Sequence, residues 1–224
     1  MAEDGLAREL RIVVRPYATA LPLGFFSFGI GMLLLAGQGN GWLHVDDQHT
    51  VGLLLAAFVF PLELLSAIFA LLSRDTFSAT GLGLFATSWL TVGLVNIQGA
   101  PGATSRAVGL YLFAFSAAIL VLAVAAFAGK PLIGTLLLLA TARAALDGSY
   151  QFGAPHWTLR TEGWIGVAIF ACSIYGGLAF LLEDQRGSEV LPVFRRGASR
   201  DALEGSLVDQ LNQLAGEAGV RQAL

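Results

Sequence analysis

The chain has 224 residues, of which 55% are hydrophobic and only 13% are charged, and its formal net charge is −3. Soluble domains carry about 25% charged residues, so this composition excludes an ordinary soluble domain and indicates a protein embedded in a lipid bilayer. The slightly acidic balance argues against a nucleic-acid partner. The single cysteine, Cys172, excludes an intrachain disulfide.

Apolar runs organise the chain. A polar N-terminal segment, residues 1–17, precedes six runs that each have about the 20 residues a helix needs to cross a bilayer. The runs are predicted at 18–37, 51–72, 77–96, 106–128, 131–149 and 161–182. The predicted fold class is therefore an all-α membrane protein with six transmembrane helices, and residues 18–184 form its transmembrane domain.

Lysine and arginine residues indicate the orientation, because cytosolic loops of membrane proteins are enriched in them. Only Arg106 and Arg160 fall on one side of the predicted membrane. The other side carries Arg8, Arg11, Arg15, Arg74, Lys130, Arg186, Arg195, Arg196 and Arg200. Both the N- and C-termini are therefore predicted to be cytosolic.

The third apolar run follows a helix-start signal, because Asp75 and Thr76 can each accept a hydrogen bond from a free N–H of the first turn. Hydroxyl side chains then recur along the run at Ser78, Thr80, Thr87, Ser88 and Thr91. They either line a polar path through the membrane or bond the backbone of their own helix. Small residues, such as Ser173 and Gly177 four positions apart, predict close helix packing.

The C-terminal tail, residues 185–224, is predicted to be cytosolic. Residues 187–200 are basic and typical of a loop. From Asp201 onward, leucines at positions 203, 207, 211 and 214 recur at helical spacing and indicate a weakly amphipathic helix. This helix either docks on the cytosolic face or a partner, or it belongs to a loosely ordered tail.

Glu63, Arg143 and Asp147 are ionisable residues predicted to lie at membrane depth, where an unpaired charge costs several kcal/mol. Arg143 and Asp147 are four residues apart and share one helix face. One interpretation is a structural Arg143–Asp147 pair, with Glu63 across the bundle. In the other, Arg143 attracts an anionic solute and Glu63 carries a proton.

Patterns typical of enzymes and metal sites do not occur. His44, His49 and His156 all fall in predicted outer loops without metal-ligand spacing, and no nucleophile-elbow or phosphate-binding motif occurs. We therefore expect a protein without catalytic residues, metal or other cofactor.

Three blocks of the chain resemble the acetate uptake transporter family, the succinate–acetate permease-like proteins. The blocks are Leu21-Pro22-Leu23-Gly24-Phe25-Phe26-Ser27-Phe28-Gly29, then Asp75-Thr76-Phe77-Ser78-Ala79-Thr80 through Ser88-Trp89-Leu90-Thr91, and Gly163-Trp164-Ile165-Gly166 with Ser173-Ile174-Tyr175 and Val190-Leu191-Pro192. Their order and spacing extend over nearly the whole six-span chain.

The resemblance implies a homo-hexameric ring with one solute path per protomer, which passes acetate and similar short carboxylates with a proton. It also implies an apolar constriction formed by Phe28, Phe85 and a leucine in the run 136–139, for which Leu138 is our choice. Phe85 stands where the family has a tyrosine, so a hydroxyl is absent. Thr19 stands where the family signature has an asparagine.

The predicted function is therefore a multi-pass plasma-membrane permease or channel for acetate or a related small carboxylate, coupled to protons. The predicted substrate path comprises Thr19, Ser27, Phe28, Thr80, Phe85, Thr87, Ser88 and Leu138. One alternative is a passive channel for a neutral solute such as ammonia, urea or a protonated acid. The other is a non-transporting membrane sensor or assembly protein that acts through the C-terminal tail.

Overall fold

The computed structural model describes residues 17–197, 199 and 200. The predictions for residues 1–16 and for the amphipathic helix after Asp201 therefore lie outside the described residues. Within the described part, six helical segments are long and apolar enough to cross a membrane. The predicted fold class is confirmed in this respect, and the predicted spans agree with the helices to within a few residues at their ends.

The second span is divided into short segments, whereas each of the other spans is one helix. The first helix is α2, Leu21–Gly39. The second span comprises η1, Val45–Asp47, α3, Gln48–Leu54, the π-helical turn η2, Leu55–Val59, and α4, Phe60–Leu72. The remaining helices are α5, Thr76–Gln98, α6, Arg106–Phe127, α7, Pro131–Gln151, and α8, Trp157–Arg186.

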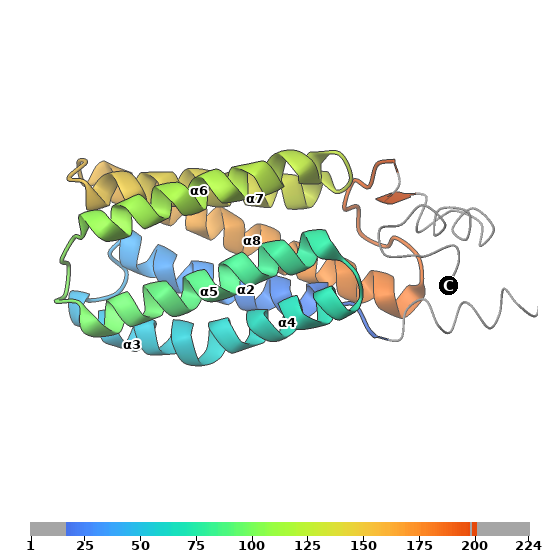
Figure 1. Cartoon of the computed structure of the whole chain (residues 1–224), viewed down its shortest axis with the longest axis horizontal. Coiled ribbons are helices and arrows are strands. Elements are labelled where there is room, and N and C mark those ends of the chain that lie inside the picture. The colour runs from blue at the N-terminus through green and yellow to red at the C-terminus, as the bar shows by residue number, and fades with distance from the viewer. Residues whose placement is uncertain (1–16, 198, 201–224) are drawn as a thin grey trace, which may run out of the picture.

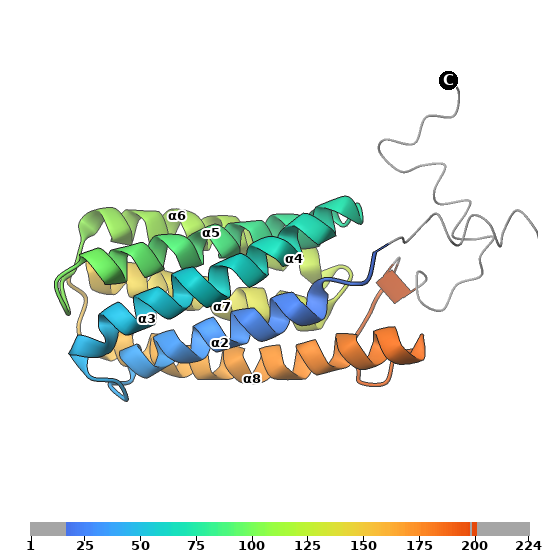
Figure 2. The ribbon, with the colours of Figure 1, turned by 90° about the horizontal axis from the view of Figure 1, so that it is seen from below.

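The helices run side by side along the long axis of the molecule, and short connections make consecutive spans antiparallel (Figure 1). The segment that enters α2 and the segment that leaves α8 lie at the same end of the bundle in both views (Figures 1 and 2). We call this end the terminal end and the other the opposite end. The α4–α5 and α6–α7 connections also lie at the terminal end.

Small residues bring neighbouring helices into close contact, as their spacing predicts. Ser173 of α8 is fully buried, and a Cβ added to Gly29 of α2 would lie 3.0 Å from its Cβ. Gly177, one turn further along α8, lies against the ring of Phe26. Dispersion contacts at such short range hold helices together where lipid offers no hydrophobic driving force.

The second span contains a wide π-helical turn at Leu55–Val59, in which the N–H of Phe60 bonds the carbonyl of Leu55, five residues earlier. Pro61 follows directly. Proline lacks an N–H, and its ring clashes with the carbonyl four residues back, so the wider turn accommodates Pro61 without breaking the span. Such turns are frequent at functional sites, and Glu63 lies two residues beyond this proline.

Asp75 caps the N-terminus of α5. Its Oδ1 accepts a hydrogen bond of 2.9 Å from Ser78 N, and its Oδ2 accepts one of 2.7 Å from Ser78 Oγ. A side-chain acceptor here satisfies a backbone donor that the first helical turn leaves free. The predicted helix start is therefore confirmed.

The segment after α8 returns across the terminal end. Gly187 ends α8 in the left-handed conformation, with φ 63°. Tyr175 Oη then donates to Pro192 O at 2.9 Å, and Arg196 N donates to Gly129 O at 2.8 Å. Val193 is fully buried between these contacts, so this part of the predicted basic loop is packed onto the bundle.

Candidate functional site

A large polar cavity of about 600 Å³ opens at the terminal end of the bundle. It is bounded by the residues before α2, the start of α5, the end of α8 and the returning segment. Charged side chains of both signs line it: Asp75, Lys130, Glu183, Asp184 and Arg195. Thr19 also lines this cavity, which we call the vestibule, and its Oγ1 accepts a 3.4 Å hydrogen bond from Leu21 N.

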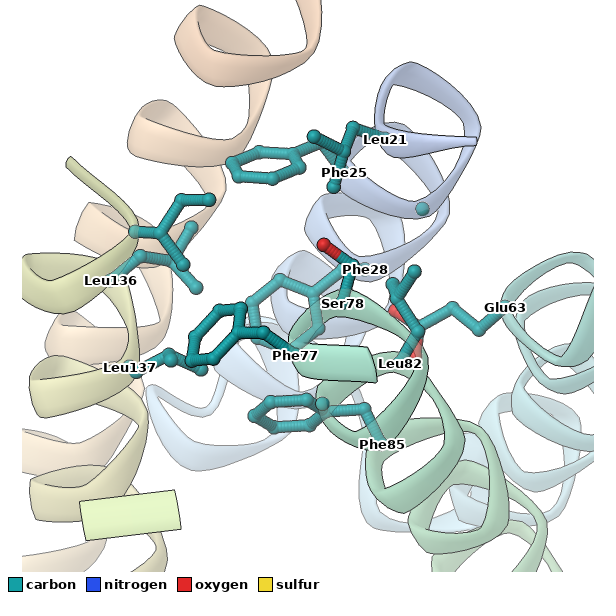
Figure 3. Close-up of a pocket in the computed structure, with 13 residues that line it drawn as sticks. Leu21, Phe25, Phe28, Glu63, Phe77, Ser78, Leu82, Phe85, Leu136 and Leu137 are labelled. Carbon is teal, nitrogen blue, oxygen red and sulfur yellow. The ribbon is translucent and has the colours of Figure 1, made fainter. Parts of the chain in front are cut away.

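A smaller cavity of about 60 Å³ adjoins the vestibule, and Leu21 and Ser78 line both. About 10–15 Å³ of such volume holds one water molecule, so this inner cavity has room for a few waters or for a solute with few heavy atoms. Its lining is almost entirely apolar and comes from α2, α4, α5 and α7 (Figure 3).

Aromatic rings close the inner cavity toward the opposite end. Phe28 of α2 and Phe85 of α5 pack edge to face, with ring centroids 4.6 Å apart, and both line the cavity. The Trp89 ring lies 5.8 Å from Phe28, and the Phe115 ring of α6 lies 5.3 Å from Phe85. The structure therefore brings together the two phenylalanines that the family resemblance assigns to a constriction.

Glu63 is the ionisable residue in the lining of the inner cavity. Figure 3 shows its side chain reaching from α4 toward the cavity. Glu63 is fully buried, and neither carboxyl oxygen has a hydrogen-bond partner. The indole N–H of Trp89 is close enough to act on this carboxyl, but the two groups do not meet the geometry of a hydrogen bond. A carboxyl with free hydrogen-bonding capacity therefore faces an apolar cavity.

Most of the predicted path hydroxyls bond the backbone of their own helix. Ser27 is buried and donates to Leu23 O at 2.8 Å. Thr80 and Thr87 are exposed on the protomer and donate to Thr76 O at 2.8 Å and Gly83 O at 3.0 Å. Ser88 is buried but does not line either cavity. Of this set, the structure brings only Thr19 to the vestibule.

The choice of Leu138 for the constriction is wrong in this structure. Leu138 is 47% exposed on the outer face of α7, whereas Leu136 and Leu137 line the inner cavity. Phe77 and Leu82 of α5 also line the inner cavity and were not among the predicted path residues. Phe77, Gly81 and Phe85 recur every four residues, and this helical spacing could have placed them on one face.

Arg143 of α7 pairs with Glu162 of α8, which the sequence analysis did not single out. Arg143 Nη2 lies 2.6 Å from Glu162 Oε2, and both side chains are buried. Asp147, the predicted partner of Arg143, instead accepts a 3.2 Å hydrogen bond from Gln151 Nε2. The predicted partner is therefore corrected to Glu162, which the bundle places opposite Arg143 by packing α7 against α8.

Within the described residues, no group of three or more His, Cys, Asp or Glu side chains could hold a metal ion. The described residues that line the cavities carry carboxyl, guanidinium, ammonium, hydroxyl and aromatic groups. Such groups can bind a small anion or its neutral acid and can exchange protons with it.

Comparison with known proteins gives consistent matches. Residues 7–195 match the model of the GPR1/FUN34/yaaH family. The succinate-acetate/proton symporter SatP of Escherichia coli strain K12 is 24% identical over 183 residues, which cover 79% of this chain and 95% of that protein. The proteins of the same name from Escherichia coli O157:H7 and Shigella flexneri match equally. A solved structure of the bacterial acetate channel SatP aligns with a TM-score of 0.70 at 20% identity, over 79% of this chain and 98% of that one.

Proposed function

This chain belongs to the GPR1/FUN34/yaaH family, and from this premise we propose that it is a multi-pass plasma-membrane permease for acetate or a related small carboxylate. Two related proteins carry names that specify such solutes, a succinate-acetate/proton symporter and an acetate channel. The family match also accords with the resemblance found in the sequence and with a role as a transporter rather than an enzyme.

The observation that carries this proposal is the position of two adjacent cavities, which share Leu21 and Ser78 as lining residues. The charged vestibule adjoins the apolar inner cavity, and Phe28 and Phe85 pack against each other in the wall of the inner cavity. In the wall of the vestibule Arg195 pairs with Glu183, and Asp75, Asp184 and Lys130 also lie there. The inner cavity, with its small volume and apolar lining, suits a short acid that has shed its water.

Proton transfer follows from the contrast between the two cavities. A carboxylate in apolar surroundings loses its hydration without compensation, whereas the neutral acid loses far less. We place the proton at Glu63, whose free carboxyl oxygens face the inner cavity. Glu63 transfers this proton to the entering carboxylate, and the solute passes Phe28 and Phe85 as the neutral acid.

The terminal end is assigned to the cytosol because most lysines and arginines of the loops gather there. Arg74, Lys130 and Arg186 belong to this end, whereas Arg106 and Arg160 belong to the opposite end. The family resemblance supports a homo-hexamer in which each protomer carries its own path. Asp147 and Arg143, toward the opposite end, would act on the anion there.

Uptake of labelled acetate into proteoliposomes tests this function. We expect uptake that increases when the compartment outside the vesicle is made more acidic than the lumen, and that unlabelled propionate or succinate reduces by competition. Empty liposomes measure the diffusion of acetic acid through lipid alone. Absence of protein-dependent uptake both with and without a pH gradient would exclude an acetate permease.

A passive channel for the neutral acid is the second candidate, since the inner cavity is apolar and one related structure is described as a channel. It shares the path but needs no proton at Glu63. The two candidates differ in the Glu63→Gln variant, which a passive channel tolerates without change in flux or in its response to a pH gradient.

A further inference from the structure

Glycines of α2 and α8 lie beside the Arg143–Glu162 pair. A Cβ on Gly39 of α2 would lie 2.7 Å from Glu162 Oε1, and a Cβ on Gly166 of α8 would lie 3.5 Å from Arg143 Nε. The first distance is shorter than real Cβ contacts, so a side chain at position 39 would displace the Glu162 carboxylate. The α2 and α8 backbones therefore lie close to the pair.

Hydrogen-bonding capacity around the pair is left unused. Arg143 Nε has no hydrogen-bond partner, and neither have the Nδ2 and Oδ1 atoms of Asn40, although all three atoms are buried. The Asn40 amide lies beside Gly163, where an added Cβ would be 2.9 Å from it. A purely structural ion pair at this depth is stable only when its remaining donors and acceptors are satisfied. These buried donors and acceptors can therefore bind a further partner beside the pair.

Arg143 occupies the same face of α7 as the inner cavity. Leu136, Ala140 and Arg143 stand at positions i, i+4 and i+7, which align on one side of a helix, and Leu136 lines the cavity. With a rise of about 1.5 Å per residue, Arg143 lies roughly 10 Å beyond Leu136 toward the opposite end. Arg143 therefore lies on the cavity-facing side of α7, nearer the opposite end than the lining leucines.

We propose that Glu162 is a tethered carboxylate that occupies the anion site of Arg143 at rest, and that the transported carboxylate takes its place there. This proposal rests on the proposed function, since it requires that a small carboxylic acid move along this path. The ligand class is a monocarboxylate, because the ligand replaces the single carboxylate that pairs with Arg143.

The exchange moves one proton from the solute to Glu162. A neutral acid arrives from the inner cavity and gives its carboxyl proton to Glu162. The O–H bond of the solute breaks, and a new O–H bond forms on Glu162. The solute, now a carboxylate, pairs with Arg143, and the neutral Glu162 carboxyl turns to the free amide of Asn40. Both acids are carboxylic, so the proton moves between groups of similar basicity.

The groups that face Glu162 come from α2 and α7, the helices packed on this part of α8. From α7 come Arg143, whose Nη2 lies 2.6 Å from Glu162 Oε2, and the nearby carboxyl group of Asp147. From α2 come Gly39 and Asn40, which carry no charge. The exchange therefore depends on the protonation of Glu162 beside Arg143.

Thermal unfolding of the purified protein in detergent tests the site, with sodium acetate compared against sodium chloride at equal ionic strength. Glu162→Ala opens a carboxylate-sized space beside Arg143, so we expect acetate to raise its Tm by several degrees more than that of the unmodified protein. Formate should act similarly. The double variant Arg143→Ala/Glu162→Ala should lose this response. Arg160→Gln, which removes an exposed arginine of α8, should leave the response of the unmodified protein unchanged.

Glu162→Gln provides the second measurement, since it keeps the volume and removes the competing charge. Equilibrium binding of labelled acetate should become about tenfold tighter or more, because the solute no longer competes with an internal charge-assisted contact. Binding to the unmodified protein should strengthen at low pH, and binding to Glu162→Gln should not. Equal affinity and equal pH dependence in both proteins, or an acetate response in the double variant, would overturn the proposal.

These outcomes separate the inference from the proposed function. If acetate raises the Tm in a way that depends on Arg143, but the unmodified protein takes up no acetate, the anion site is supported and acetate transport is rejected. Acetate uptake without an Arg143-dependent response rejects the tethered carboxylate and leaves the permease standing.

Discussion

The ring of Phe28 on α2 meets the ring of Phe85 on α5 edge to face, with centroids 4.6 Å apart, where the inner cavity ends. Each ring is anchored by further aromatic neighbours, Trp89 on one side and Phe115 on the other. Under the proposed function, a solute that follows the two cavities separates this pair. We therefore expect the size and packing of the two rings to determine which acids pass.

Replacing Phe85 by leucine should widen this contact. We expect uptake of succinate to increase relative to acetate by several-fold, because a smaller side chain leaves more room beside Phe28. The loss of the ring pair should cost about 0.5–1.5 kcal/mol of stability. Initial rates of labelled acetate and succinate uptake measure the ratio, and Phe58→Leu, at an exposed position of the second span, is the control. An unchanged ratio would contradict the constriction.

Glu63→Gln should uncouple solute movement from the proton. The amide keeps the shape of the buried side chain but cannot transfer a proton, so acetate uptake should no longer respond to an imposed pH gradient. Uptake measured at matched acetate gradients, with the pH gradient present or collapsed by an ionophore, checks this. Ser66→Ala is the matched control, because Ser66 lies one turn along α4, is buried, and bonds only the Leu62 carbonyl. If acetate uptake by the Glu63→Gln protein still responds to the pH gradient, another group must carry the proton.

The Arg143–Glu162 pair predicts strong non-additivity in stability. Arg143→Met or Glu162→Leu alone should destabilise the protein by roughly 3–5 kcal/mol, because each leaves one buried charge unpaired. The double variant should recover most of this loss, since an apolar pair of similar volume removes both charges. Unfolding of the four proteins in a double-mutant cycle measures the coupling. Additive losses would show that the pair has no energetic coupling.

Asp75→Ala should destabilise the start of α5 by about 1 kcal/mol, the usual cost of removing a helix cap. Asp75→Ser keeps an acceptor for Ser78 N and should retain most of the stability. Thermal unfolding of both variants separates the cap from a mere change of charge in the vestibule, because both remove the carboxylate. An equal loss of stability in Asp75→Ala and Asp75→Ser would show that the missing carboxylate charge, and not the missing cap, causes the destabilisation.

The helices were predictable because each span must bury about 20 residues in lipid, and that requirement is visible as an uninterrupted apolar run. The helix start at Asp75 was predictable for a similar reason, since capping depends on residues close in sequence. Phe28 and Phe85 came from the family resemblance, and the structure brings them into contact.

Which face of a helix points inward was less predictable. Thr87 and Leu138 turn outward on α5 and α7 because packing between helices sets their rotation, and an apolar run in lipid carries little polar contrast to reveal it. Glu162 was not predicted to lie at membrane depth because it stands at the edge of the predicted span 161–182. The helix begins at Trp157, which places Glu162 more than a turn inside it.

The π-helical turn at Leu55–Val59 also affects how the second span tolerates insertions and deletions. The turn holds one residue more than an α-helical turn needs, so the loss of Ala57 together with Pro61→Ala would convert it to an ordinary turn. Val51 and Glu63, on either side, would keep their inward faces. The same deletion inside α5 would rotate every later residue by about 100°. The second span can therefore change length by one residue while its buried acid stays in place.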